Sequence, residues 1–100
     1  MGETILFVVC EIGLLTRGTE KLIEFHKYNA NIPYFPRLDY VSPICQEVLY
    51  INAVERSNYY SITKYTSNSR TLFLEIVRIL NHLLAITTHG IDIGALNPML

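Results

Sequence analysis

Hydrophobic positions along the chain form one short apolar run followed by three stretches with helical periodicity. The run at residues 5–10 is rich in β-branched side chains and lies between Gly2 and Gly13, a pattern typical of a buried β-strand over residues 3–10. The run is too short to cross a bilayer as a helix, and no basic segment precedes it, so no cleavable targeting signal is predicted. The three helical stretches are expected at about residues 19–31, 43–56 and 68–90.

The first helix is expected to begin at Thr19, because threonine caps helices with its side-chain oxygen. Glu20 would lie in the first turn, where the helix dipole favours a negative charge. The buried side of this helix is expected to contain Leu22, Phe25 and Tyr28. The pattern therefore predicts an amphipathic helix that packs on the rest of the chain.

Two prolines, Pro33 and Pro36, predict an extended connection after this helix, because each fixes its own φ and disfavours the α conformation in the preceding residue. Ser42 followed by Pro43 predicts a new helix, with serine as the cap and proline at the first helical position. Residues 57–69 are polar and are expected to form a loop. The side chains expected to be buried on the second helix are Ile44, Val48, Leu49 and Ile51.

The last helix is apolar almost all round, which indicates burial in a larger body or in a membrane. Five ionisable residues nevertheless recur on about one third of its circumference: Glu75, Arg78, His82, His89 and Asp92. So many ionisable groups disfavour a membrane span, and they must face water, a partner or a site. A solvated or salt-bridged helix face is an alternative. The spacing of the two histidines and the aspartate matches no specific metal site, so no metal is expected.

The composition supports a chain that is completed by partners. One hundred residues predict a single domain, half of the residues are hydrophobic, and 17% are charged, below the roughly 25% of a typical soluble domain. A chain this short buries only part of its apolar surface alone. The net charge of −1 indicates no nucleic-acid partner. Cys10 and Cys45 lie far apart without a CxxC pattern, so they are expected to be reduced, packed thiols.

Three stretches resemble a known family in their order and spacing. They read GLLTRGTEKL at residues 13–22, PYFPRLDYVS at residues 33–42, and a helical run at residues 70–98 that contains TTHGIDIGA. Together they resemble an internal segment of the quinone-site, forty-nine-kilodalton subunit of respiratory NADH:ubiquinone oxidoreductase (complex I). The resemblance implies a mainly α fragment of the nickel–iron hydrogenase large-subunit-like fold, an N-terminal strand followed by three helices. Because only Cys45 lies where the hydrogenases place a CxxC motif, nickel chemistry is not expected.

The resemblance also implies roles for four residues. Tyr40 matches the tyrosine that hydrogen-bonds the ubiquinone headgroup, and Ser42 lies close to the same pocket. Asp92 matches an aspartate that pairs with a histidine on a hairpin outside this chain, and Arg17 matches an arginine near the terminal iron–sulfur cluster. Two positions depart from the family, in which histidine usually precedes this arginine and aspartate usually precedes Arg37. Here the residues are Thr16 and Pro36.

The implied protein is a partial domain over residues 1–100, completed by other chains and inactive alone. It would serve a proton-translocating NADH:ubiquinone reductase in which ubiquinone is the substrate and this chain binds no cofactor. The iron–sulfur cluster would belong to a neighbouring subunit, and FMN would lie elsewhere in the complex. Expected partners are the remaining pieces of a split quinone-site subunit, the terminal-cluster subunit and the adjoining membrane-arm subunit. The expected location is the matrix side of the mitochondrial inner membrane.

Two other interpretations remain open. One is a structural fragment of the complex that has no quinone chemistry of its own. The other is an independent small helical binding protein, which the all-round apolar character of the last helix disfavours.

Overall fold

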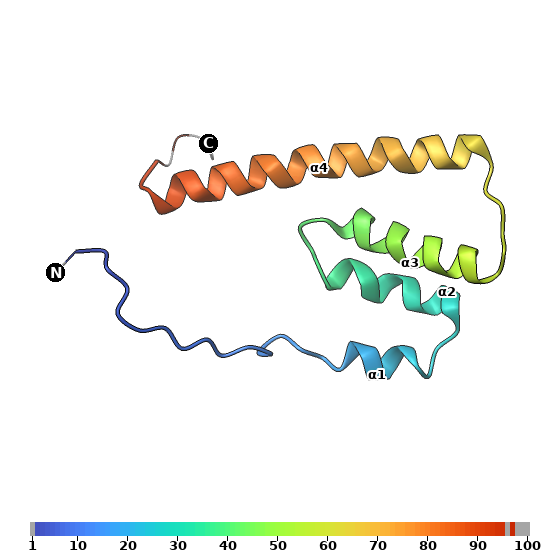
Figure 1. Ribbon diagram of the computed structural model, residues 1–100, viewed down its shortest axis with the longest axis horizontal. Coiled ribbons are helices and arrows are strands. Elements are labelled where there is room, and N and C mark those ends of the chain that lie inside the picture. The colour runs from blue at the N-terminus through green and yellow to red at the C-terminus, as the bar shows by residue number, and fades with distance from the viewer. Residues whose placement is uncertain (1, 96, 98–100) are drawn as a thin grey trace.

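The computed structural model describes residues 2–95 and 97. A long extended segment leads into a series of helices, and the last helix runs back over the one before it (Figure 1). The helices in chain order are α1 (Thr19–Ile23), α2 (Tyr28–Asn31), the 3₁₀ helix η1 (Ile32–Arg37), α3 (Pro43–Ser57) and α4 (Lys64–Asp92).

The predicted N-terminal β-strand is wrong. No strand occurs among the described residues, and residues 3–10 run as an extended segment along the outside of the molecule (Figure 1). Ile5 and Phe7 are 78% and 83% exposed. A β-branched apolar run favours extended backbone, but a strand also needs a neighbouring strand to pair its N–H and C=O groups. The described chain offers no such neighbour, so the fold class over these residues is helical.

The first predicted helix is divided into shorter pieces. Gly18 precedes α1 with φ 64°, a left-handed conformation that glycine adopts without steric cost, and Thr19 is the first helical residue rather than the cap. Residues 24–27 separate α1 from α2. Asn31 is buried, and its Nδ2 donates to the carbonyl of Ile23 at 3.1 Å. The asparagine side chain thereby ties the end of α1 to the end of α2.

A 3₁₀ helix replaces the extended connection expected around the two prolines. Pro33 lies in the first turn of η1, where its missing N–H group costs nothing. Pro36 lies inside η1, so the 3₁₀ pattern provides no N–H donor for the carbonyl of Pro33. The guanidinium of Arg37 donates to this carbonyl instead. The arginine side chain therefore supplies the hydrogen bond that the second proline removes.

Aromatic contacts hold η1 against α3. The rings of Phe35 and Tyr50 stack with centroids 4.1 Å apart and planes 18° from parallel. The Tyr50 hydroxyl donates to the backbone carbonyl of Tyr28 at 3.1 Å. One α3 residue thus fixes both η1 and the start of α2, and this determines where the residues after η1 lie.

The helix α4 begins earlier than the polar composition of residues 57–69 indicates. Thr63 caps it, because its Oγ1 accepts from the backbone N–H of Thr66 at 3.3 Å. Val77 faces α3 and is the buried hydrophobic side chain of the described chain, 6% exposed. The stripes expected to be buried on the first two helices remain partly open, with Phe25 74% and Leu49 65% exposed.

About half of α4 extends past α3. The two helices contain 29 and 15 residues, so at 1.5 Å per residue they are roughly 43 and 22 Å long. In Figure 1 the C-terminal half of α4 reaches beyond the start of α3. Its apolar side chains are open, with Leu83 56% and Ile86 67% exposed. By length and composition α4 could cross a membrane, but the core helix of a larger soluble body meets the same criterion.

Candidate functional site

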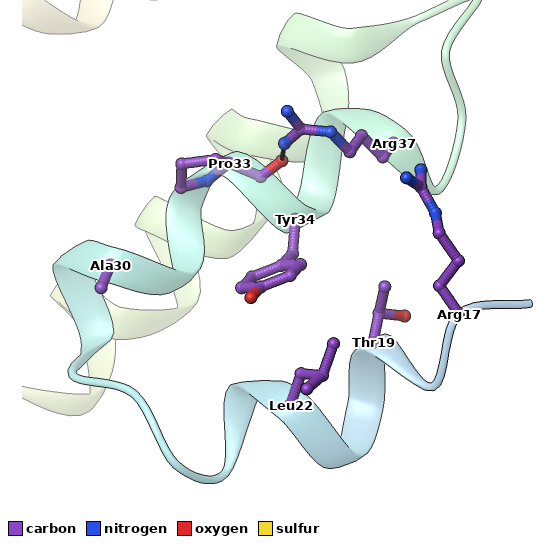
Figure 2. A pocket seen from close by; sticks show the side chains of 7 residues that line it. All are labelled: Arg17, Thr19, Leu22, Ala30, Pro33, Tyr34 and Arg37. Carbon is purple, nitrogen blue, oxygen red and sulfur yellow. Dashed lines mark hydrogen bonds between the residues drawn. The ribbon is translucent and has the colours of Figure 1, made fainter.

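Arg17 lies at the entrance to α1, between two turns. The backbone N–H of Thr16 donates to the carbonyl of Gly13 at 3.1 Å, and Gly18 follows in the left-handed conformation. These turns direct the exposed arginine side chain toward η1 (Figure 2). The local backbone therefore places a fixed positive charge opposite the proline-containing 3₁₀ helix.

A pocket of about 450 Å³ lies between α1 and η1. Figure 2 shows the Tyr34 ring directed into this pocket, with Arg17 and Arg37 along one edge. His26 stacks on Tyr34 with ring centroids 5.9 Å apart, which supports the ring from outside the pocket. The full lining consists of Arg17, Thr19, Leu22, Ala30, Pro33, Tyr34 and Arg37.

A second pocket of about 450 Å³ shares Arg17, Thr19 and Arg37 with the first. Tyr40 lines this second pocket and is 73% exposed. The structure therefore brings together two of the residues to which the sequence resemblance gives roles, Arg17 and Tyr40. The pocket combines charged groups with leucine side chains, a mixture that suits a ligand with both polar and apolar parts.

Tyr40 is carried by a tight turn between η1 and α3. The Asp39 side chain accepts from the N–H of Val41 at 3.2 Å, and its backbone carbonyl accepts from the N–H of Ser42, also at 3.2 Å. An aspartate that bonds to the backbone two residues later is a common stabiliser of turns. The turn at residues 38–42 is thus closed by its own hydrogen bonds, and it presents the tyrosine side chain outward.

Ser42 stands at the cap position of α3, as the Ser-Pro pair predicts, but its side chain makes no capping hydrogen bond. Its Oγ instead accepts from Nδ2 of Asn81 on α4 at 2.6 Å, in a partly buried contact. Ser42, two residues after Tyr40, is therefore hydrogen-bonded to α4, 39 positions further along the chain.

Asp92 lies apart from the second pocket, at the last residue of α4. It is exposed and follows Asn81 by eleven residues, which places it about three turns or roughly 16 Å further along the helix axis. Eleven residues at 100° each return almost to the same helix face. Asp92 is therefore on the side of α4 from which Asn81 contacts Ser42, beyond the end of the α3 contact.

The polar stripe of α4 divides into two parts. Arg78 and Glu75 form an ion pair with Nε and Oε2 2.9 Å apart, in which both side chains are more than half exposed. This pair fits the solvated or salt-bridged interpretation of the stripe. His82, His89 and Asp92 are exposed further along the helix. The described chain gives no ion pair to Asp92.

The ion pair that joins two helices of the described chain lies outside the two pockets that contain Arg17. Arg70 on α4 donates to both carboxylate oxygens of Glu55 on α3, at 2.6 and 2.7 Å, and also to Oδ1 of Asn52 at 2.9 Å. Hydrogen bonding to Arg70 lowers the pKa of Glu55, and the same bonding raises the pKa of Arg70. These residues join two helices rather than form a reacting centre.

Sequence reasoning missed Asn81 and Arg70 as the polar contacts of α4. The signal that could have found them is spacing, because Arg70, Leu74, Val77 and Asn81 follow one another at intervals of four, three and four residues. This pattern defines the face of α4 that packs on α3, polar at both ends and apolar in the middle. Glu75, Arg78, His82 and His89 lie on another part of the helix surface, whereas Asp92 shares the side of α4 on which Asn81 lies.

The described residues form a helical unit with a surface pocket lined by arginine and tyrosine. No family model matches the chain. Curated proteins do match it over 99% of its length. They include NADH dehydrogenase [ubiquinone] iron-sulfur protein 2 of Nephroselmis olivacea at 54% identity, the NADH-ubiquinone oxidoreductase 49 kDa subunit of Reclinomonas americana at 52%, and NADH dehydrogenase [ubiquinone] iron-sulfur protein 2 of Arabidopsis thaliana at 52%.

Over its length the chain is homologous to an internal segment of the 49 kDa subunit of NADH–ubiquinone oxidoreductase. The resemblance seen in the three sequence stretches is thereby confirmed. The chain spans about a quarter of the length of these relatives, 25% in each case.

Proposed function

We propose that the chain is a component of the respiratory NADH–ubiquinone oxidoreductase, complex I, and forms part of its quinone-reduction site. The observation that carries this proposal is the identity of 52–54% to proteins with these names over nearly the whole chain. Tyr40 and Arg17 line one pocket, and this arrangement supports a role at the site itself.

In this proposal Tyr40 orients the quinone headgroup. Its phenolic hydroxyl donates a hydrogen bond to one headgroup carbonyl oxygen, and the aromatic ring contacts the apolar face. Reduction of the quinone to the quinol adds two electrons and two protons. In this proposal the Tyr40 hydroxyl passes one proton to the oxygen that becomes negative, and water supplies the second proton and reprotonates Tyr40. The exposure of Tyr40 on a closed turn supports this role, because the side chain is available and its backbone is held.

Arg17 and Asp92 have electrostatic roles in the proposal. The positive charge of Arg17 would stabilise the reduced form of an iron–sulfur cluster close to it. The cluster belongs to a neighbouring subunit, because a four-cysteine cluster does not fit this chain. Cys10 is exposed in the N-terminal segment and Cys45 is half-buried in α3. Asp92 responds to the charge that develops on the quinone, and this response initiates coupling to proton translocation.

The open apolar surface supports the expected partners. Side chains of the N-terminal segment and of the projecting half of α4 are exposed in the described chain, for example Leu6 at 85% and Leu83 at 56%. Contiguous exposed apolar surface marks sites of protein–protein contact. We infer that the rest of the quinone-site subunit, the terminal-cluster subunit and the adjoining membrane-arm subunit cover it. The complex would lie at the mitochondrial inner membrane, with this part on the matrix side.

A substitution at Tyr40 tests the quinone role. In complex isolated from membranes, Tyr40→Phe should lower quinone reductase activity by about tenfold or more, because a positioned proton donor is lost. NADH oxidation by an artificial acceptor that bypasses the quinone should not change. Tyr65→Phe is the matched control, since Tyr65 on α4 is 81% exposed and outside both pockets. If Tyr40→Phe behaves like Tyr65→Phe, the chain is a structural fragment of the complex without quinone chemistry of its own.

A further inference from the structure

The turn that carries Tyr40 needs an external support. The hydrogen bonds of Asp39 close the turn internally, but they do not determine its direction relative to the helices. Tyr40 itself is 73% exposed, so few contacts of its own side chain fix its position. Its orientation therefore depends on what holds the two ends of the turn at residues 38–42.

The Asn81 side chain holds one end of the turn. Its Nδ2 donates to Ser42 Oγ at 2.6 Å, and the contact is partly buried. A serine at this position would ordinarily use its hydroxyl oxygen to cap α3, but here that oxygen accepts from α4. The hydrogen bond that stabilises a helix start has thus been exchanged for one that joins the turn to another helix.

The position of Asn81 on α4 explains how this hydrogen bond can hold the turn. Asn81 follows the buried Val77 by one helical turn on the packed face, and α4 projects beyond the start of α3 after it. Asn81 therefore lies at the end of the α3–α4 contact, next to the part of α4 that projects beyond α3. At the other end of the helix pair, the equivalent amide is Asn52, which accepts from Arg70 at 2.9 Å.

We propose that Asn81 is a positioning residue for quinone reduction, which acts by holding Ser42 and thereby the direction of Tyr40. The proposal rests on the proposed function, because it concerns the same site. The Asn81 side chain touches neither the pocket nor the quinone in this scheme. Its loss should loosen the tyrosine turn and weaken binding of the headgroup, while helix pairing persists through Val77 and the Arg70–Glu55 pair.

The test measures steady-state quinone reduction by complex isolated from membranes. Asn81→Leu keeps the branched shape but cannot hydrogen-bond, and it should raise the quinone KM by about three- to tenfold, the equivalent of one lost hydrogen bond, with a smaller change in kcat. Asn81→Asp accepts a hydrogen bond from the Ser42 hydroxyl and should restore a KM near that of the unaltered complex. Asn52→Ala is the matched control, because it removes another amide that hydrogen-bonds between α3 and α4. The quinone KM of this variant should equal that of the unaltered complex.

Three results would overturn the proposal. They are an unchanged KM in Asn81→Leu, an equal rise in Asn52→Ala, and a rise in Asn81→Asp as large as that in Asn81→Leu. If Asn81→Leu does not assemble, Asn81→Ala avoids steric conflict and takes its place with the same expectation.

A double variant separates this proposal from the assignment of Tyr40. If Asn81 acts through the tyrosine, Asn81→Leu should raise KM less in the Tyr40→Phe background than in the unaltered complex. Full additivity would contradict the positioning role. If Tyr40→Phe alone has no effect on quinone reduction, the proposed function fails. If only the Asn81 variants have no effect, the function stands and the positioning role fails.

Discussion

Arg70 and Glu55 join α4 to α3 through a two-pronged ion pair, with Nη2–Oε1 and Nη1–Oε2 distances of 2.6 and 2.7 Å. Each side chain is 20% exposed, so water screens the pair less than it screens a surface pair. The planar guanidinium matches the two carboxylate oxygens and therefore sets the rotation and the axial offset of the two helices. With this offset, Asn81 lies opposite Ser42.

Loss of the Arg70–Glu55 ion pair should reduce assembly of the complex. Arg70→Met removes the charge while it keeps an extended side chain, and it leaves the Glu55 carboxylate without its partner in a half-buried setting. We expect a severalfold fall in assembled complex on native gels. Arg78→Met is the matched control, because the Arg78–Glu75 pair is exposed and lies within one helix. Equal effects of the two substitutions would show that the cross-helix pair has no special role.

The same ion pair predicts a pH dependence of the α3–α4 contact. Hydrogen bonding to Arg70 holds the pKa of Glu55 below its ordinary value of about 4.3. The stabilisation is therefore complete above that ordinary value, and it is lost as the pH falls through the lower folded-state pKa. Amide hydrogen exchange of α3 and α4 in the complex should be slower than in Glu55→Gln at neutral pH. The difference should shrink below about pH 4.3. If the difference in exchange rate stays constant below about pH 4.3, ionised Glu55 does not stabilise the α3–α4 contact.

Asp92 should affect coupling more than assembly. Because Asp92 lies at the exposed end of α4, Asp92→Asn removes a charge without opening a packed contact. We expect unchanged assembly, slower quinone reduction and fewer protons translocated per quinone reduced, measured in vesicles that contain the complex. Glu75→Gln removes a charge from the same helix as a control and should leave this ratio unchanged. An unaltered ratio in Asp92→Asn would exclude Asp92 from the coupling step.

Local sequence patterns locate the helix starts with different success. The Ser42-Pro43 pair correctly marks the first turn of α3, because the preference of proline for the first helical position depends on neighbouring backbone alone. Thr63 caps α4 by an equally local contact, but the polar composition of residues 57–69 obscures it. The two prolines predict an extended connection because their effect on the preceding residue is local, whereas packing of Phe35 on Tyr50 favours the compact η1.

The sequence by itself determined the resemblance to a segment of the 49 kDa subunit and the helical character of residues 43–56 and 68–90, because both depend on side-chain type and spacing. The residues proposed for the site follow from that resemblance. Only the tertiary structure decided that residues 3–10 form no strand, since strand formation requires a partner that no local pattern specifies. The tertiary structure alone also decided that Arg17 and Tyr40 line one pocket and that Asn81 reaches Ser42 across 39 positions of the chain. Such contacts depend on the mutual offset of helices, which the Arg70–Glu55 pair and Val77 set in three dimensions.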